Sequence, residues 1–207
     1  MDQTTSPAPR IRPAGAADTG WISQFLRERW GAAIVVVHGE VIDASRLPAL
    51  IAEPRRGLAT YRRLGEDAEL VTLDAVPAGI GTGTALLDAL TRQLCAQGCV
   101  RLWLTMTNGN LSALQFYLRR GFRLTAVRLG AVDAARKLKP TIPLFGEHGI
   151  PLHNELDLCR ILGTAAQEVP APPPWPQGNS AESRGKTQPN SRKAPLWPLK
   201  TRYQSMA

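Results

Sequence analysis

The segment from Leu73 to Leu87 constrains the fold of this chain more than any other stretch. It passes from β-forming residues, through Gly79, Gly81 and Gly83, into a run with helical periodicity. Successive backbone N–H groups in such a loop remain unpaired, and the positive end of the following helix dipole adds to them. The segment therefore predicts an anion site between a strand and a helix, suited to a pyrophosphate.

Two common phosphate-binding motifs do not fit this loop. A P-loop requires Gly-Lys-Ser/Thr after its glycines, and the loop contains no lysine. A dinucleotide fingerprint requires G-x-G-x-x-G/A, and its third position falls on Thr84 or on Leu86, depending on the starting glycine. Coenzyme A remains as the third ligand class that uses the same physics.

The order of hydrophobic patterns around the loop predicts an α/β architecture. Asp18 is the expected N-cap of a first helix, and Gly98 and Gly121 are the expected stops of two later helices. Helices are expected at 18–30, 84–97 and 111–120, and strands at 33–37, 50–53, 57–62, 69–76, 100–106, 122–129 and 152–161. Such an order favours a mixed sheet covered by helices.

Two motifs in this frame resemble the GNAT N-acetyltransferases. Residues 78–83, Ala-Gly-Ile-Gly-Thr-Gly, are similar to that family's Q/R-x-x-G-x-G/A pyrophosphate motif, with Ala78 in place of the usual Gln or Arg. Residues 110–122, Asn-Leu-Ser-Ala-Leu-Gln-Phe-Tyr-Leu-Arg-Arg-Gly-Phe, are similar to its N-x-x-A-x-x-x-Y-x-x-x-G-F helix. The resemblance covers roughly residues 10–163. It implies a mixed, mostly antiparallel sheet flanked by helices, with acetyl-CoA as co-substrate.

The resemblance also implies where the coenzyme binds. In that family the strand before the glycine loop splays from its neighbour, and its amides hold the pantetheine. Leu73, Ala75 and Val76 are then expected to supply backbone contacts, with an amide near Ala75 as the oxyanion donor. Arg119 and Arg120 are candidates for the 3′-phosphate or for a solvated helix end. The other expected cofactor residues are Gly79, Gly81, Thr82, Gly83, Thr84, Asn110, Ala113 and Phe116, the last of which also fits a core position.

The implied reaction is direct attack of a neutral amine on the acetyl thioester. The amine must lose a proton, the tetrahedral oxyanion needs a donor, and the leaving thiolate needs a proton. Tyr117 matches the family's acid for the thiolate, because a phenol with a pKa near ~10 is protonated at neutral pH. The alternative for Tyr117 is a tyrosine of the core.

The base is to be chosen among Glu69, Asp74 and a water chain. Glu69 resembles the place where histone-type members carry a glutamate base, and we expect it to act, with an ion-paired or solvent-facing glutamate as the alternative. In an unbroken strand Glu69 and Asp74 point to opposite faces. Only a β-bulge between them would bring both side chains to one cleft.

The sequence does not identify the acceptor. Glu155 and His153, on the expected last strand, are candidates for lining its pocket, with a surface position as the alternative for His153. His38 has no pattern around it that predicts a partner.

The chain divides into a folded part and two termini. We expect a flexible N-terminus at 1–9, one domain at 10–163 and a Pro-rich basic tail at 164–207. Eight of the 17 prolines lie past residue 168, and residues 164–207 hold six Lys or Arg against two Asp or Glu. Such a segment cannot bury enough apolar surface to offset its ordering entropy, so we expect it to be disordered.

Composition narrows the compartment and the partners. No apolar run is long enough to span a membrane and residues 1–9 lack the apolar part of a secretory signal, so we expect a cytoplasmic protein. Cys95, Cys99 and Cys159 predict reduced thiols, and no metal site is expected because no further ligands lie near them in the sequence. The expected partners are acetyl-CoA and an amine acceptor, without nucleic acid; a homodimer stays open.

The expected function is that of an acetyl-CoA-dependent N-acetyltransferase acting on a primary amine of an unidentified small molecule or protein. One alternative is a catalytically weak acyl-CoA-binding module, which Ala78, Gly109 and Asn154 favour because they depart from the family's usual residues. Another alternative is an adaptor that acts through the basic tail.

Overall fold

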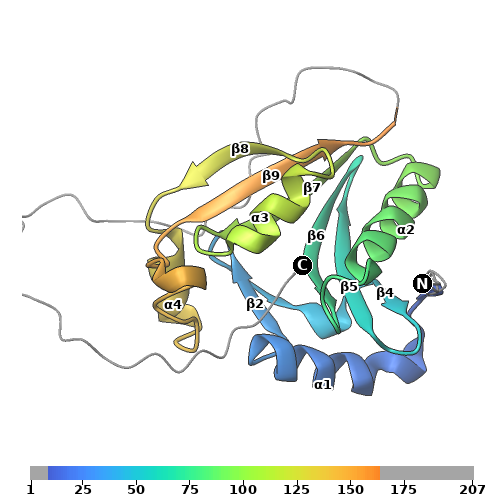
Figure 1. Cartoon of the computed structure of the whole chain (residues 1–207), viewed down its shortest axis with the longest axis horizontal. Helices are drawn as coiled ribbons and strands as arrows, with labels where there is room; N and C mark the ends of the chain where they lie inside the picture. Colours follow the sequence, from blue (N-terminus) through green and yellow to red (C-terminus); the bar gives the residue numbers. More distant parts are fainter. Residues whose placement is uncertain (1–8, 164–207) are drawn as a thin grey trace, which may run out of the picture.

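The sheet has seven strands, of which only one neighbouring pair runs parallel. In this computed structural model, which describes residues 9–163, the strand order is β1-β4-β5-β6-β7-β9-β8 (Figure 1). β6 and β7 are parallel and the other pairs are antiparallel. The strands are β1 (Ile11–Pro13), β4 (Ala49–Ala52), β5 (Gly57–Leu64), β6 (Asp67–Ala75), β7 (Arg101–Thr107), β8 (Arg123–Arg128) and β9 (Glu155–Ile161). The predicted mixed, mostly antiparallel sheet is confirmed, and the predictions for residues 1–8 and 164–207 lie outside the described residues.

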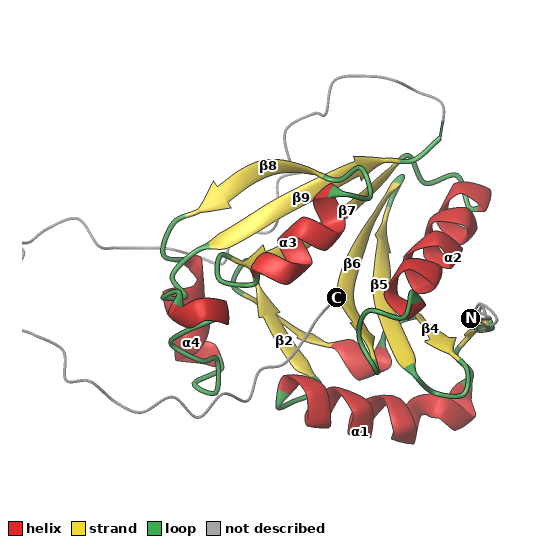
Figure 2. Cartoon of the chain, in the orientation of Figure 1, coloured by secondary structure: helices red, strands yellow, loops and turns green. Residues whose placement is uncertain are grey.

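Helices cover both faces of the sheet (Figure 2). One face packs against α2 (Thr82–Ala96) and α3 (Leu111–Leu118). The other face packs against α1 (Thr19–Trp30) and a hairpin of β2 (Ile34–Val37) and β3 (Glu40–Asp43). The remaining helices are α4 (Ala131–Leu138) and three short 3-10 segments at Ala16–Asp18, Ala44–Arg46 and Glu147–Gly149. Among residues 9–163, no helix combines the length and apolar character of a membrane span.

The helical stripes seen in the sequence form the two cores. Leu86, Leu87, Leu90 and Leu94 of α2 are fully buried against the sheet. On the opposite face, the buried residues of α1 are Ile22, Phe25 and Leu26. Burying such side chains stabilises each helix on its face by about 1.5–3 kcal/mol per residue.

Several expected element boundaries were wrong. β1, β3 and α4 were not predicted, and the last strand begins at Glu155 because residues 152–154 belong to a loop. Asp18 occupies the N-cap position of α1, but its side chain makes no cap hydrogen bond. It accepts instead from Arg12 at 2.7 and 2.9 Å and from the Gly15 amide at 2.9 Å. Because the Asp18 carboxylate binds Arg12, it does not cap α1 as expected.

β6 and β7 pair only at their beginnings and then separate. Pairing joins Asp67–Glu69 to Arg101–Trp103, after which no register pair connects the two strands. Figure 1 shows them close at one end and apart at the other. A β-bulge accompanies this separation, because Tyr61 pairs with Leu70 while Thr60 pairs with Thr72. The extra residue in β6 bends the strand and increases its twist.

The bulge also changes which face each side chain of β6 occupies. Leu70 and Leu73 both join the core under α2 and α3, although they are an odd number of residues apart. Val71 belongs to the core under α1, and Asp74 contacts Arg29 of α1. Glu69 contacts Arg62, which also binds Glu40 of the hairpin. Glu69 and Asp74 consequently lie on the same face of the sheet.

Candidate active site

A cavity of about 250 Å³ occupies the opening between β6 and β7. Residues 70–74 of β6 and 104–107 of β7 line it, together with the end of α1, β2 and the segment after α4. Most of its lining is apolar. Its charged side chains are Arg29, Asp74, Lys139, Glu147 and Glu155.

A narrower cleft of about 20 Å³ lies between the end of β6, the start of α2 and α3. Leu73, Asp74, Ala113 and Tyr117 line both this cleft and the larger cavity. The two spaces therefore meet at Asp74 and Tyr117. The cleft's full lining is Leu73, Asp74, Ala75, Gly83, Ala113, Phe116 and Tyr117, which includes five of the predicted cofactor residues and the predicted acid.

The glycine loop leaves a row of amides available beside this cleft. Gly79 and Gly81 have φ angles of 79° and 87°, a left-handed conformation that glycine adopts without steric cost. Within the described part of the chain, the amides of residues 79–84 donate no hydrogen bond. Because α2 begins at Thr82, the first of these amides also stand at a helix N-terminus. The loop has the geometry of an anion site.

Two predicted cofactor residues have structural partners of their own. The Val76 amide donates to the carbonyl oxygen of Arg56 at 2.7 Å, so this N–H is already used within the sheet. Asn110 caps α3, because its Oδ1 accepts from the Ala113 amide at 3.1 Å. Asn110 also lines the larger cavity.

Arg120 lies against the glycine loop, whereas Arg119 is exposed. Its guanidinium stacks over the Phe116 ring at 3.6 Å and donates to Thr84 Oγ1 and to the Phe116 carbonyl. Burial lowers the pKa of Arg120, but an arginine keeps its charge at any physiological pH. A fixed positive charge therefore lies beside the row of amides.

Tyr117 is buried at the junction of the two spaces. Its ring makes edge contacts with Phe116 at 5.1 Å and Phe122 at 5.3 Å. Its hydroxyl has no hydrogen-bond partner in residues 9–163. Burial, followed by the negative charge of Asp74, raises its pKa well above the usual value. Tyr117 thus holds its proton and can donate it into either space.

Asp74 is a buried carboxylate in which one oxygen is hydrogen-bonded and the other is not. Oδ2 accepts from Arg29 Nε at 3.0 Å, whereas Oδ1 makes no hydrogen bond to a described residue. Burial raises the pKa of Asp74, while Arg29, the Ala75 backbone and the nearby Trp30 indole oppose the shift. A buried carboxylate with a raised pKa is suited to accept a proton near neutral pH.

Glu69, by contrast, lines neither of these two spaces. Its Oε2 accepts from Arg62 Nε at 2.6 Å, and Arg62 also donates to both carboxylate oxygens of Glu40 at 2.7 and 2.8 Å. Although the bulge places Glu69 and Asp74 on one face, only Asp74 reaches Tyr117. The arrangement therefore brings together Asp74 and Tyr117, and leaves Glu69 in an ion-pair network.

His38 has partners that sequence reasoning missed. It lies at the turn of the β2–β3 hairpin with a φ of 52°. Its Nε2 is 2.8 Å from Thr105 Oγ1 and 2.9 Å from Asp157 Oδ1, and its amide donates to Glu155 Oε2 at 3.3 Å. These contacts were not predicted. The only signal in the sequence was the spacing of Glu155 and Asp157, which places both on one face of a strand.

The two candidates for the acceptor pocket are separated by the structure. Glu155 is buried and lines the larger cavity. His153 precedes β9, its side chain is 58% exposed, and its Nδ1 lies 2.8 Å from Asp133 Oδ2. His153 is therefore a surface residue, which was the alternative for it.

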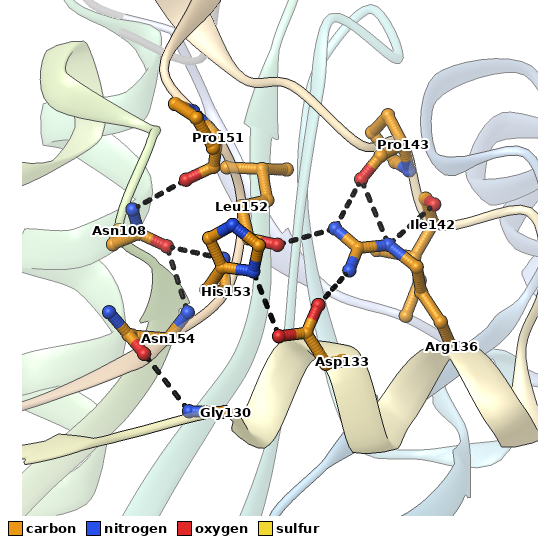
Figure 3. A network of polar contacts seen from close by, with 10 residues as sticks. All are labelled: Asn108, Gly130, Asp133, Arg136, Ile142, Pro143, Pro151, Leu152, His153 and Asn154. Carbon is orange, nitrogen blue, oxygen red and sulfur yellow. Dashed lines mark hydrogen bonds and ion pairs between the residues drawn. The ribbon is translucent and has the colours of Figure 1, made fainter. Parts of the chain in front are cut away.

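The wall opposite the strands is held by a polar network around two asparagines (Figure 3). Asn108 Oδ1 accepts from the amides of His153 and Asn154 at 3.0 and 2.9 Å, and its Nδ2 donates to the Pro151 carbonyl at 2.9 Å. Asn154 Oδ1 accepts from the Gly130 amide at 3.0 Å, at the start of α4. Asn154 thus helps to hold the segment that forms the cavity wall.

Gly109 and Gly146 pack backbone against backbone in the same wall. The Gly109 carbonyl accepts from the Glu147 amide at 2.9 Å, and both glycines line the cavity. A Cβ on Gly146 would lie 2.6 Å from the Gly109 oxygen and 2.8 Å from Leu152 Cδ2. Gly109 therefore has a packing role.

Gly146→Ala is expected to lower the free energy of unfolding by about 1–3 kcal/mol, because the added methyl group must displace backbone atoms. Thermal unfolding measures the change. Gly20→Ala is the matched control, since nothing lies within 4 Å of a Cβ at that position of α1 and alanine favours a helix. Equal melting temperatures for Gly146→Ala and the wild type would show that the wall is not close-packed.

No group of three or more His, Cys, Asp or Glu within residues 9–163 could hold a metal ion. The three cysteines are free, with Cys99 and Cys159 buried and Cys95 exposed.

The sequence around this site matches a known protein family. The model of the acetyltransferase (GNAT) family matches residues 68–122, which run from β6 through the glycine loop, α2, β7 and α3 to the start of β8. The uncharacterized protein YxbD of Bacillus subtilis (strain 168) is 33% identical over 145 residues, covering 68% of this chain and 91% of that protein.

Two solved structures share the fold at low sequence identity. An IAA acetyltransferase from Bacillus cereus ATCC 14579 has a TM-score of 0.58 at 18% identity, covering 75% of this chain and 100% of that one. A GNAT family acetyltransferase from Elizabethkingia anophelis, solved with acetyl-CoA bound, has a TM-score of 0.55 at 15% identity, covering 76% and 100%.

Proposed function

Because this chain belongs to the GNAT acetyltransferase family, we propose that it transfers the acetyl group of acetyl-CoA to a primary amine by direct attack. The observation that carries the proposal is the meeting of the narrow cleft and the larger cavity at Asp74 and Tyr117. A thioester entering from the cleft and an amine entering from the cavity would reach each other at that point.

The cleft side suits the coenzyme. The amides of residues 79–84 would hold the pyrophosphate, and the backbone of Leu73 and Ala75 would contact the pantetheine. Arg120 adds a positive charge at Thr84, which compensates for the missing Gln or Arg side chain at position 78. These residues bind and orient the thioester, and none of them needs to take part in proton transfer.

The cavity side suits the acceptor and its deprotonation. The amine nitrogen attacks the thioester carbonyl carbon and passes a proton to Asp74 Oδ1, directly or through a water molecule. When the tetrahedral intermediate collapses, the C–S bond breaks and the sulfur leaves as a thiolate. Tyr117 donates a hydrogen bond and then its proton to that sulfur, which gives an N-acetyl amide and free coenzyme A, and the proton held by Asp74 passes to the Tyr117 phenolate, directly or through water, to restore both groups.

Arg120→Met is expected to weaken acetyl-CoA binding about 10-fold, which corresponds to about 1.4 kcal/mol. Titration calorimetry of the wild type and the variant measures the dissociation constants. Arg119→Met is the matched control, because it removes the same charge from the exposed neighbouring position. A weaker affinity in the Arg119 variant than in the Arg120 variant would place the phosphates elsewhere.

Release of free thiol from acetyl-CoA in the presence of a panel of primary amines tests the proposed reaction. Amine-dependent release supports it. Binding of acetyl-CoA without release by any amine would instead identify an acyl-CoA-binding module, and the absence of binding would overturn both.

A further inference from the structure

Two cavity carboxylates, Glu147 and Glu155, make no ion pair with a described Lys or Arg, and only Glu155 of these two is buried. The Glu155 side chain is 5% exposed. Oε2 accepts from the His38 amide at 3.3 Å, and the His38 ring nitrogen lies 3.9 Å away. That nitrogen is already within 2.9 Å of Asp157. A buried carboxylate in this setting gains from a cationic ligand, because an unpaired buried charge is costly.

The contrast with Asp157 on the same strand supports this reading. Asp157 accepts from Arg128 Nε at 2.7 Å and from Thr105 Oγ1 at 2.9 Å. Burial raises the pKa of Asp157, but these partners and His38 outweigh it, so the net shift is downward. Burial, and to a lesser degree Asp157, raise the pKa of Glu155, and the opposing effects of His38 and Arg128 do not outweigh them. The Asp157 carboxylate therefore has an arginine ion pair, whereas the Glu155 carboxylate, which faces the cavity, has no such ion pair with a described residue.

The other charged side chains of the cavity are engaged. Arg29 pairs with Asp74. Glu147 Oε2 accepts from the Ser112 amide and hydroxyl at 3.0 and 2.9 Å. Lys139 Nζ donates to the carbonyls of Trp30 and Ile34 at 3.3 and 2.9 Å, at the end of α1. Glu155 is therefore the cavity carboxylate best placed to bind a cationic group on the acceptor.

Asp74 and Glu155 stand opposite each other across the opening. Both lie on the face of the sheet that carries α1 and the β2–β3 hairpin. Glu155 pairs with Thr107 at the end of β7, Asp74 lies near the end of β6, and both line the cavity between the separated ends of the strands. Apolar side chains, among them Val35, Val71 and Met106, line the same cavity.

The separation of the two strands sets a minimum length for the acceptor. β6 and β9 flank β7, so their backbones are about 10 Å apart or more, at about 4.8 Å per strand spacing. Two hydrogen bonds of about 2.8 Å take up part of that distance, and about 4 Å remains. Two or three carbon atoms between two amines span this minimum, and the divergence of β6 from β7 makes room for a longer chain.

We infer that the acceptor is a diamine, with one amine acetylated beside Asp74 and Tyr117 and the second bound as an ammonium by the Glu155 carboxylate. This inference rests on the proposed acetyl transfer and names its substrate class.

Three acceptors of matched length test the inference: 1,5-diaminopentane, 1-aminopentane and 5-aminopentanoate. The wild type is expected to acetylate the diamine with a kcat/KM about 30-fold or more above that of the monoamine. Glu155→Gln is expected to remove that advantage, mainly through KM, and to leave the monoamine within a few-fold of its wild-type rate. Glu66→Gln removes the same charge from an exposed position and is the control.

Each other outcome overturns the inference. Equal use of the diamine and the monoamine would show that Glu155 binds no second charge. Preference for 5-aminopentanoate would place an anion at Lys139 instead. An equal loss for all acceptors in Glu155→Gln would show a structural role.

Calorimetry separates the inference from the proposed reaction. It measures binding of 1,5-diaminopentane to the protein saturated with coenzyme A. Binding that weakens about 30-fold in Glu155→Gln, without thiol release in any assay, would support the diamine site and overturn the acetyl transfer. Thiol release with amines, without this difference in binding, would support the acetyl transfer and overturn the diamine site.

Discussion

Tyr117→Phe is expected to lower kcat for acetyl transfer by about 100- to 1,000-fold and to leave the affinity for acetyl-CoA nearly unchanged. The variant removes one oxygen atom, so the edge contacts of the ring with Phe116 and Phe122 persist while the proton donor to the leaving sulfur is lost. Because burial and Asp74 raise the pKa of Tyr117, the wild-type phenol stays protonated across the working range. The rate loss should therefore be similar from about pH 7 to pH 9. Steady-state thiol release and calorimetry measure the two quantities.

Tyr61→Phe is the matched control for this variant. Tyr61 is a buried tyrosine of the same hydrophobic core, its hydroxyl contacts Gln93, and it lines neither the narrow cleft nor the larger cavity. We expect it to keep the wild-type kcat. Unchanged rates in Tyr117→Phe at every pH would remove Tyr117 from the proton transfer.

Asp74→Asn is expected to lower kcat/KM by about 100-fold and to change the pH profile. The wild-type base must be ionised, so activity is lost as the pH falls through the pKa of Asp74. Burial raises that pKa, which moves the loss to a higher pH than for an ordinary aspartate. The variant should lack this acidic limb and retain only the dependence on the amine's own ionisation. A pH series of thiol release at subsaturating amine measures both effects.

The stability of this variant separates catalysis from folding. Because the pKa of Asp74 is raised, the native protein binds its proton more tightly than the unfolded chain does, and ionisation at neutral pH opposes folding. Asparagine carries no charge, so the variant avoids the cost of ionising a buried carboxyl group. It also loses the ion pair with Arg29, which acts in the opposite direction. We expect a melting temperature close to that of the wild type at neutral pH.

Glu69→Gln is the matched control for the choice of base. Glu69 is also a buried carboxylate of β6 with a pKa raised by burial, but it lies in the Arg62 network away from both spaces. Its rate is expected to stay within a few-fold of the wild type. A greater loss in Glu69→Gln than in Asp74→Asn would return the role of base to Glu69.

The sequence predicted the elements whose patterns are long and local. The leucine stripe of α2 and the glycines after β6 are read from neighbouring residues, and the structure has both the helix and the glycine loop where the sequence predicted them. α4 was missed because it has only eight residues, and its buried side chains Val132 and Ala135 make a single helical repeat that is too short to be distinguished from a loop. The sequence did contain a signal for the β2–β3 turn, which is Gly39 directly after the apolar run of β2. His38 and Gly39 form a two-residue turn in which both adopt the positive φ that such hairpin turns require.

The candidate site was harder to predict because its contacts are distant in the chain. His38 and Asp157 are 119 residues apart, and nothing near either residue indicates the other. The choice between Glu69 and Asp74 depended on a bulge at Val71 that β-forming residues tolerate without any special signature. The alternation of side chains along a strand correctly indicated that a bulge between Glu69 and Asp74 was needed to bring them to one face. Only the register of β6 with β5 shows that this bulge is present.

The bulge in β6 makes the number of residues between Glu69 and Asp74 as important as their identity. A deletion of Val71 would remove the bulge and leave Glu69 and Asp74 four residues apart, still on one face, but without the bend that accompanies the separation of β6 from β7. A one-codon deletion elsewhere between the two residues that kept the bulge would instead turn Asp74 toward α3, so the spacing along β6 decides whether a carboxylate meets the thioester.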